Sequence, residues 1–286
     1  MPRRAPIILA LPFLLAPALQ ARASIRIDNP ATIHDNTDFP CIGRIDTPDG
    51  TGTGTLVGPS GMWVLTARHV VCDSNNMPLA AAGLRFRSGA GGITGHTVTM
   101  VVCNPTADFA LIKLDDVLGA GYATSSAAVT NGTMFCTAGF GNTATNAGTP
   151  TASWTDNTNA RRVYYNTVNN GSDTYNGSSA STYDFSCPPG PPAPVPGEGI
   201  GGAGDSGQPM LTGGNPPTTI RGIYVGNIAQ PNGDDRPVWG ATGVFVNITP
   251  AIQTWINSTI PAPAPAATLG VALLTLGRAR RSRAST

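Results

Sequence analysis

Short apolar runs separated by turn residues fill the middle of the chain. Nine segments are rich in Val, Ile, Thr and aromatic residues and are bounded by Gly, Pro, Asn or Asp, which is the pattern of β-strands joined by turns. We therefore expect an all-β architecture. The predicted strands lie at residues 53–58, 62–71, 84–88, 96–103, 109–114, 134–141, 161–168, 220–226 and 242–248.

One helix is predicted, at residues 249–257. Thr249 can cap it, Pro250 suits its first position, and its apolar residues recur on one face. Two long stretches are expected to be loops: residues 142–182, rich in Asn, Thr, Ser and Gly, and the proline-rich residues 187–198. Loops of this length in a compact domain are usually functional rims or disordered inserts.

The first 23 residues have the pattern of a secretory signal. Arg3 and Arg4 precede a short apolar run that ends in Ala21-Arg22-Ala23. A basic head, an apolar middle and an A-x-A end predict a signal peptide at 1–23, cleaved after Ala23. A buried first helix is the alternative, but three prolines interrupt the run. We expect the mature chain to be secreted.

Residues 260–286 form a separate segment at the other end. A Pro-Ala spacer leads to a short apolar stretch and then to the basic "RARRSR". The apolar stretch is shorter than the roughly 20 residues that span a bilayer. This tail resembles the PEP-CTERM sorting signals of exported bacterial proteins, with Pro-Ala-Pro where those have Pro-Glu-Pro. The resemblance implies sorting machinery at the cell surface or envelope of a bacterium; the alternative is a disordered tail.

Charge argues against a nucleic-acid partner. Seven of the 17 basic residues lie near the two ends, whereas all 16 acidic residues lie between them. An acidic middle with a single lysine, Lys113, lacks the clustered basic surface that nucleic-acid binding needs. Only 12% of residues are charged, so Asn, Thr, Ser and Gly must keep the surface polar, as in many β-rich extracellular proteins.

Five cysteines in an exported chain indicate disulfides, and their odd number leaves at least one thiol unpaired within the chain. They are Cys41, Cys72, Cys103, Cys136 and Cys187, and spacing alone does not give their pairing. The sequence contains no C-x-x-C pair and no H-E-x-x-H run, so we expect no metal site. A G-x-G-x-x-G run at residues 199–204 follows a proline-rich loop instead of a strand, so we expect no dinucleotide cofactor.

Three polar residues are candidates for catalysis. His69 ends one predicted strand, Asp108 opens another, and Ser206 lies in the glycine-rich run "IGGAGDSGQPM". Each alone has an ordinary explanation: a core histidine, a strand-start cap and a surface turn. Together they supply a nucleophilic hydroxyl, a base, and an acid that orients the base, which acyl transfer requires.

The segments "VLTARHV", "DFALIKL" and "GDSGQP" resemble, in this order, the His, Asp and Ser boxes of the trypsin/chymotrypsin family of serine peptidases (S1 type). "GTGTLV", "TAGFG" and the closing helix also fit, so the resemblance runs from about residue 25 to 258. It implies two packed six-stranded antiparallel β-barrels with a short C-terminal helix. The peptidase domain would span 24–259, with subdomains at about 24–125 and 126–259.

The same resemblance implies a serine endopeptidase, a monomer without a cofactor, that acts on proteins or peptides. Ser206 would attack the carbonyl to form an acyl-enzyme, His69 would take its proton, and Asp108 would orient the histidine. The N–H groups of Gly204 and Ser206 would stabilise the oxyanion. An inactive homologue that serves as a surface binding module is the alternative, and a purely structural surface protein is a third. The presence of all three residues favours the enzyme.

By the family pattern, Ile200 lies at the base of the specificity pocket. Val225, Gly226 and Asn227 would form one wall, and Gly243 would lie near the floor. Since Ile200 offers no carboxylate to pair with Lys or Arg, we expect small or medium apolar side chains before the cleaved bond.

Two further features follow from the resemblance. Asp205 would pair on maturation with a new α-amino group, such as that of Ile25 or Ile27; alternatively, side-chain or backbone donors hold it without processing. The cysteine that usually follows the catalytic histidine is absent, and Cys72 could take its place with another partner. Cys136 matches a family cysteine whose partner is absent.

Overall fold

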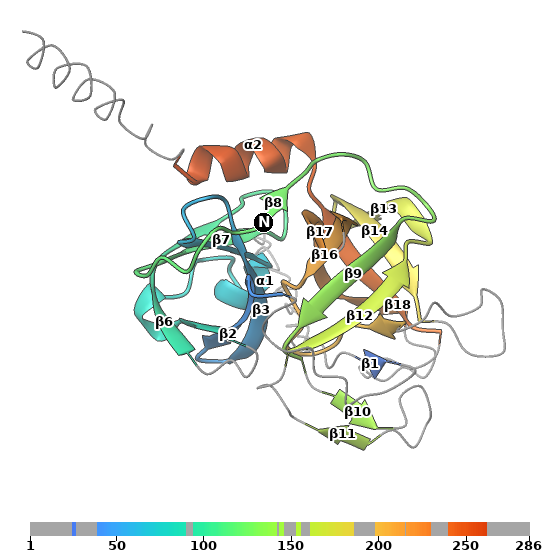
Figure 1. Ribbon diagram of the computed structural model, residues 1–286, viewed down its shortest axis with the longest axis horizontal. Coiled ribbons are helices and arrows are strands. Elements are labelled where there is room, and N and C mark those ends of the chain that lie inside the picture. Colours follow the sequence, from blue (N-terminus) through green and yellow to red (C-terminus); the bar gives the residue numbers. More distant parts are fainter. Residues whose placement is uncertain are drawn as a thin grey trace, which may run out of the picture.

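Strands carry most of the described structure, in two sets that follow one another along the chain (Figure 1). This computed structural model describes residues 25–26, 39–89, 94–141, 143–145, 153–155, 161–185, 198–214, 216–229 and 240–261. The predicted signal peptide at 1–23, Cys187 and nearly all of the tail and of the proline-rich stretch lie outside the described residues.

The first set closes into a six-stranded antiparallel barrel whose interior is apolar. Ile45, Val64, Phe86 and Ile112 share the inner face of the barrel and are fully buried. In barrel order the strands are β2 (Ile42–Thr47), β3 (Gly50–Val57), β4 (Trp63–Thr66), β7 (Ala110–Leu114), β6 (Thr94–Cys103) and β5 (Arg85–Ser88), which returns to β2.

The second set is an eight-stranded sheet around an aromatic core. The rings of Phe135, Tyr183 and Phe245 pack with centroids 5.1 to 5.3 Å apart. The strand order is β12 (Arg162–Thr167), β9 (Met134–Gly139), β16 (Pro209–Gly214), β17 (Pro217–Ala229), β18 (Thr242–Asn247), β14 (Ser178–Asp184) and β13 (Asn170–Tyr175), and β8 (Ala123–Thr124) pairs with β17. The predicted all-β fold class is confirmed.

Two short strand pairs lie outside these sets. β1 (Ile25–Arg26) pairs with β15 (Gly199–Ile200), and β10 (Thr143–Thr145) pairs with β11 (Ser153–Thr155). The two strand sets are joined by buried Arg161, which precedes β12 and donates from Nη1 to the carbonyl oxygens of Phe39 and Ile42.

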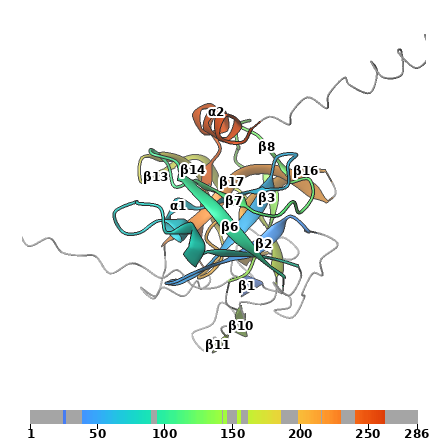
Figure 2. The ribbon, with the colours of Figure 1, turned by 90° about the vertical axis from the view of Figure 1, so that its left-hand side faces the viewer.

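The predicted C-terminal helix is present as α2 (Pro250–Thr259). The Thr249 hydroxyl accepts from the N–H of Ile252 at 3.4 Å, as a helix cap should. Gln253 then donates to Thr124 of β8 at 2.8 Å, and both views place α2 at the end of the molecule opposite β10 and β11 (Figures 1 and 2). In the part of the chain that the structure describes, no helix has the length and apolarity to cross a membrane.

The predicted strand 62–71 is wrong in its second half. β4 ends at Thr66, and Arg68–Val71 form the one-turn helix α1, closed by a bond from Val70 N–H to the Ala67 carbonyl at 3.2 Å. A second short turn, the 3₁₀ helix η1 (Ala81–Gly83), precedes β5. α1 ends in two β-branched apolar residues, Val70 and Val71, which are typical of strands, so composition alone did not mark where the strand ends.

The predicted loop 142–182 is also wrong in part, because β10, β11 and β13 lie within it and β14 overlaps its end; β12 corresponds to the strand predicted at 161–168. β13 and β14 form a hairpin that turns at Asn176-Gly177, where φ is +48° and +78°. Asn-Gly with two positive φ values is the preferred two-residue hairpin turn. Exposed positions alternate along β13, and β14 carries buried polar residues, so neither strand shows the apolar alternation that predicts a strand.

Candidate active site

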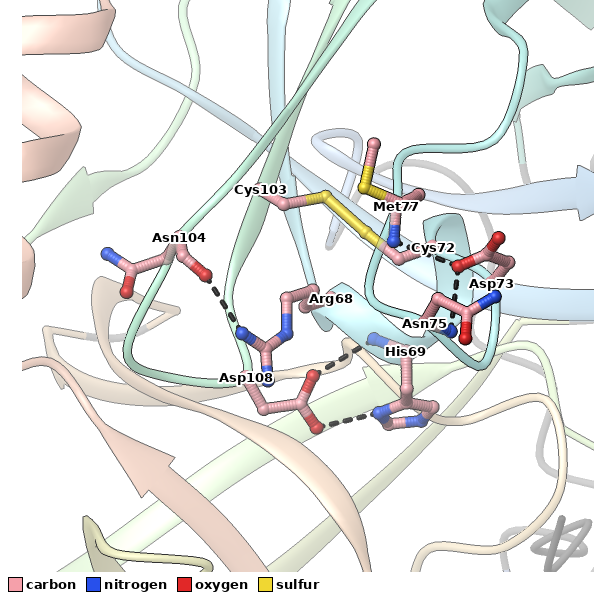
Figure 3. Close-up of a disulfide and its surroundings, with 9 residues drawn as sticks. All are labelled: Arg68, His69, Cys72, Asp73, Asn75, Met77, Cys103, Asn104 and Asp108. Atoms are coloured by element: carbon pink, nitrogen blue, oxygen red, sulfur yellow. Dashed lines mark hydrogen bonds and ion pairs between the residues drawn. A yellow bond between two sulfur atoms is a disulfide. The ribbon is translucent and has the colours of Figure 1, made fainter. Parts of the chain in front are cut away.

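His69 and Asp108 meet because their flanking strands are antiparallel neighbours. Thr66, at the end of β4, pairs with Ala110, at the start of β7. The residues just after β4 therefore lie beside those just before β7. His69 Nδ1 is 2.7 Å from Asp108 Oδ2, and the His69 backbone N–H donates to Asp108 Oδ1 at 3.0 Å (Figure 3).

Asn104 shapes the loop that presents Asp108. Its side-chain oxygen accepts from the backbone N–H groups of Thr106 and Ala107, at 3.0 and 2.9 Å. Its backbone carbonyl accepts from Arg68 Nη1 at 3.0 Å, which ties the loop to α1. Sequence analysis did not single out Asn104, although the Asn-Pro pair that it opens is a turn signal.

Opposing effects set the charge state of His69. Removal from water lowers its pKa, but attraction to the Asp108 carboxylate and their hydrogen bond outweigh this, so the pKa of His69 is raised above its ordinary 6.5. Arg68 acts weakly in the opposite direction. The imidazole is still 45% exposed, and solvent therefore screens the pair.

The carboxyl group of Asp108 shifts the other way. Burial raises its pKa, but His69 and Arg68, together with the His69 backbone N–H, favour the charged form more strongly, so the net pKa of Asp108 is lowered. Asp108 therefore stays ionised at neutral pH. It holds the proton on His69 Nδ1 and leaves Nε2 free to act as a base.

Ser206 reaches the first barrel through close packing of the backbone beside it. A Cβ atom added at Gly207 would lie 2.2 Å from the Thr53 carbonyl oxygen and 3.0 Å from the nitrogen of Ala67, two residues before His69. Only glycine allows this approach, and its φ of +89° also favours glycine. No hydrogen bond joins Ser206 Oγ to His69 among the described residues; in unliganded enzymes such contacts are often long.

The backbone around Ser206 offers two N–H donors. Neither Gly204 nor Ser206 donates its N–H to any acceptor within the described ranges. Gly204 is half-buried and has a φ of +85°, and Ser206 is 7% exposed. Two unused donors beside a serine hydroxyl are what an oxyanion site requires.

Asp205 is fully buried between backbone donors. Its Oδ1 accepts from Gly141 N–H at 2.9 Å, and its Oδ2 accepts from Gly202 N–H at 3.0 Å. Burial lowers the pKa of Arg162, and attraction to Asp205 opposes that shift, so the guanidinium and the carboxylate favour each other's charge. These contacts favour the alternative in which Asp205 needs no processed N-terminus, and the pairing with an α-amino group stays a prediction.

Four of the five predicted pocket residues lie on β17 and β18 of the second strand set, and Ile200 lies on β15. Ile200 is fully buried, Val225 is 6% exposed, and Gly226 and Gly243 are buried. Asn227 Nδ2 donates to the Gly201 carbonyl at 3.1 Å, so one predicted wall is bonded to the segment opposite. A separate cavity of about 200 Å³ lies beside His69 and includes none of the five. It is lined by Arg68, His69, Asn76, Thr106, Asp108, Tyr175, Asn176 and Ser178.

One disulfide, Cys72–Cys103, links the end of α1 to the end of β6 (Figure 3). It thereby joins the segment that carries His69 to the loop that leads to Asp108. Cys136 is buried, and Cys41 is a free, buried thiol whose removal from water raises its pKa to about 11. Cys72 has a partner, as its position suggested, but the sequence did not identify it.

Removing this disulfide is expected to destabilise the fold. Cys72→Ala combined with Cys103→Ala should lower the free energy of unfolding by about 3–4 kcal/mol, because the bridge spans 31 residues and restricts the unfolded chain. Guanidinium denaturation with and without a reductant measures this. Reductant should weaken the wild type and leave the double variant unchanged. Equal stability of the two under oxidising conditions would contradict the prediction.

Within the described ranges, no group of three or more His, Cys, Asp or Glu side chains could hold a metal ion.

Comparisons with known proteins find one family model and solved structures that are similar to this chain. Residues 52–191, which include His69 and Asp108 and end before Ser206, match the family model of the trypsin-like peptidase domain. Two solved structures share the fold at 17% identity. One is titled "Structure of Glu endopeptidase in complex with MPD" (TM-score 0.54, 83% of this chain and 96% of that chain). The other is Kallikrein-related peptidase 10 (TM-score 0.51, 77% and 95%).

A comparison with curated proteins finds no match. At 17% identity the two solved structures bear on the fold alone, and that fold is a closed barrel followed by a second, mainly antiparallel sheet. The family match begins within β3, so it covers most of the barrel but not β2, and it includes the paired His69 and Asp108. Residues 52–191 therefore match the trypsin-like peptidase domain, and the fold is chymotrypsin-like.

Proposed function

We propose that this chain is a serine endopeptidase that cleaves peptide bonds through His69, Asp108 and Ser206. Ser206 Oγ attacks the carbonyl carbon while His69 Nε2 takes its proton. The N–H groups of Gly204 and Ser206 bind the oxyanion, and His69 then passes the proton to the leaving amine. Water, activated by the same histidine, hydrolyses the acyl-enzyme and restores Ser206.

The observation that carries the proposal is the bonded pair of His69 and Asp108. Asp108 contacts both the ring and the backbone of His69, at 2.7 and 3.0 Å, which fixes the tautomer with a basic Nε2. The backbone N–H groups of Gly204 and Ser206 find no acceptor among the described residues and lie on the segment that carries the serine. An inert binding module has no need for either arrangement.

A fluorophosphonate probe tests the proposal directly, because it reacts with a serine only when a base and an oxyanion site activate it. The folded protein should be labelled at Ser206, as located by peptide mass spectrometry, and heat-denatured protein should not be labelled. A folded chain that stays unlabelled and cleaves no peptide library would instead support the inactive surface-binding homologue.

We further propose that the site accepts a small side chain before the cleaved bond. The Asn227 amide bridges to the Gly201 carbonyl and accepts from the Tyr224 hydroxyl at 2.9 Å. The bond to Gly201 joins the expected wall on β17 to the segment that follows Ile200, and the bond from Tyr224 lies within β17 and holds the amide in place. A large side chain would have to break them, and leaving such groups unpaired is costly.

Asn227→Ala is accordingly expected to widen specificity. Wild-type protein should prefer Ala or Val before the cleaved bond in a peptide library. The variant should gain about tenfold in kcat/KM for Leu relative to Ala, because one methylene in a hydrophobic pocket changes kcat/KM by roughly 10–200-fold. Ile228→Ala, at the exposed neighbouring position, serves as the control. A library dominated by Arg or Lys would refute this specificity.

Export and surface sorting complete the proposal. The basic-apolar-A-x-A start and the Pro-Ala, apolar and basic tail support a chain that leaves a bacterial cell and is retained at its surface or envelope. Terminal sequencing of the exported protein should find Ser24 first. Full activity in a form that still carries residues ahead of Ser24 would exclude pairing of Asp205 with a new α-amino group.

A further inference from the structure

We propose that Thr53 is a positioning residue that holds both oxyanion donors in place, an inference that rests on the proposed function. Thr53 belongs to β3 of the first barrel, whereas the Ser206 segment belongs to the second strand set. Its backbone N–H donates to the Ser206 carbonyl at 2.8 Å, and its hydroxyl donates to the Gly204 carbonyl at 2.9 Å. One residue thus binds the carbonyls of both donor residues.

The Thr53 hydroxyl is also held from a second direction. Oγ1 accepts from the Phe140 backbone N–H at 3.1 Å, just after β9 ends. The next residue, Gly141, donates to the Asp205 carboxylate at 2.9 Å. Thr53 is fully buried, so water cannot replace these bonds without opening the contact between the two strand sets.

These bonds constrain the peptides next to the donors. The bond to the Gly204 carbonyl fixes the peptide that follows Gly204, and the bond to the Ser206 carbonyl fixes the peptide that follows Ser206. The N–H groups of both residues donate to no acceptor among the described residues. They lie within the segment that the two bonds from Thr53 hold at its ends. Donors must point at the oxyanion position before the reaction begins in order to stabilise the transition state. We therefore expect Thr53 to affect mainly kcat.

Thr55, two positions further along β3, provides a matched control. It is buried to the same degree, but its hydroxyl has no hydrogen-bond partner among the described residues. Replacing that hydroxyl leaves no partner unsatisfied. A comparison of the two threonines therefore separates the hydroxyl's bonds from the general effect of altering a buried threonine in this strand.

The test compares Thr53→Ser, Thr53→Val, Thr53→Ala and Thr55→Val. Thr53→Val and Thr53→Ala should lower kcat about tenfold or more and leave KM within about twofold. The expected loss in kcat is smaller than the roughly 10²–10³-fold lost when one oxyanion donor is removed outright. Thr53→Ser, which restores the hydroxyl, and Thr55→Val should stay near wild type. Equal losses in Thr53→Ser and Thr53→Ala, or a loss confined to KM, would overturn the proposal.

Hydrogen exchange provides a readout that does not depend on activity. Peptides covering residues 202–208 should exchange faster in Thr53→Ala than in Thr53→Ser and wild type, while peptides from α2 remain unchanged. If wild-type protein proves inactive, the proposed function fails, and exchange still decides the positioning role. Equal protection of 202–208 in Thr53→Ser and Thr53→Ala would then refute it.

Discussion

Ser206→Ala is expected to abolish peptide hydrolysis while leaving the fold intact. The variant lacks the only atom that forms the acyl-enzyme, and loss of such a nucleophile costs about 10⁶-fold in kcat in the best-studied serine peptidase series. Residual hydrolysis would come from binding and the two backbone donors. Cleavage of a fluorogenic peptide library measures the effect.

The controls for Ser206→Ala address folding and chemistry separately. Ser206 is 7% exposed and its carbonyl accepts from Thr53, a bond that alanine retains, so thermal unfolding should change little. Ser258→Ala, at an exposed serine on α2, should keep full activity. Equal cleavage rates for Ser206→Ala and wild type would remove the catalytic assignment and, with it, the proposed function.

The parts of the site that sequence could predict are those set by local pattern. Segments around His69 and Asp108 stand at the edges of apolar runs, and apolar runs of this length pair as strands. Once β4 and β7 are antiparallel neighbours, the two residues must lie side by side. The position of Ser206 followed only from resemblance, since 137 residues separate it from His69 and no local pattern fixes a contact over that distance.

Side-chain networks account for what the sequence did not reveal. Composition does not specify contacts between residues that are distant in sequence, such as the bond from Asn227 to Gly201 and the bonds from Thr53 to the Ser206 segment. It does not specify the turn held by the Asn104 side chain either. The β13–β14 hairpin was missed for another reason. Its strands are polar, and the Asn176-Gly177 signal was absorbed into a stretch whose overall composition resembles a loop.

Asp108→Asn should lower kcat by about 10⁴-fold at neutral pH, the loss observed when asparagine stabilises the wrong histidine tautomer in such a triad. The amide can donate to His69 Nδ1, which leaves the proton on Nε2 and removes the base. The backbone bond from His69 N–H to Oδ1 can persist, so the fold should tolerate the change. Steady-state kinetics with a fluorogenic peptide and thermal unfolding measure the two effects.

The pH dependence of Asp108→Asn separates electrostatics from orientation. The base must be neutral, so kcat/KM should rise as the pH passes upward through the pKa of His69, which Asp108 raises above 6.5 in the wild type. Without the carboxylate that pKa falls, and the midpoint of the profile should move to lower pH. Asp116→Asn is the matched control, because Asp116 holds His96 through the same Nδ1 contact, at 2.8 Å, away from Ser206. A midpoint that moves in Asp116→Asn or stays fixed in Asp108→Asn would contradict the assignment of His69 as the base held by Asp108.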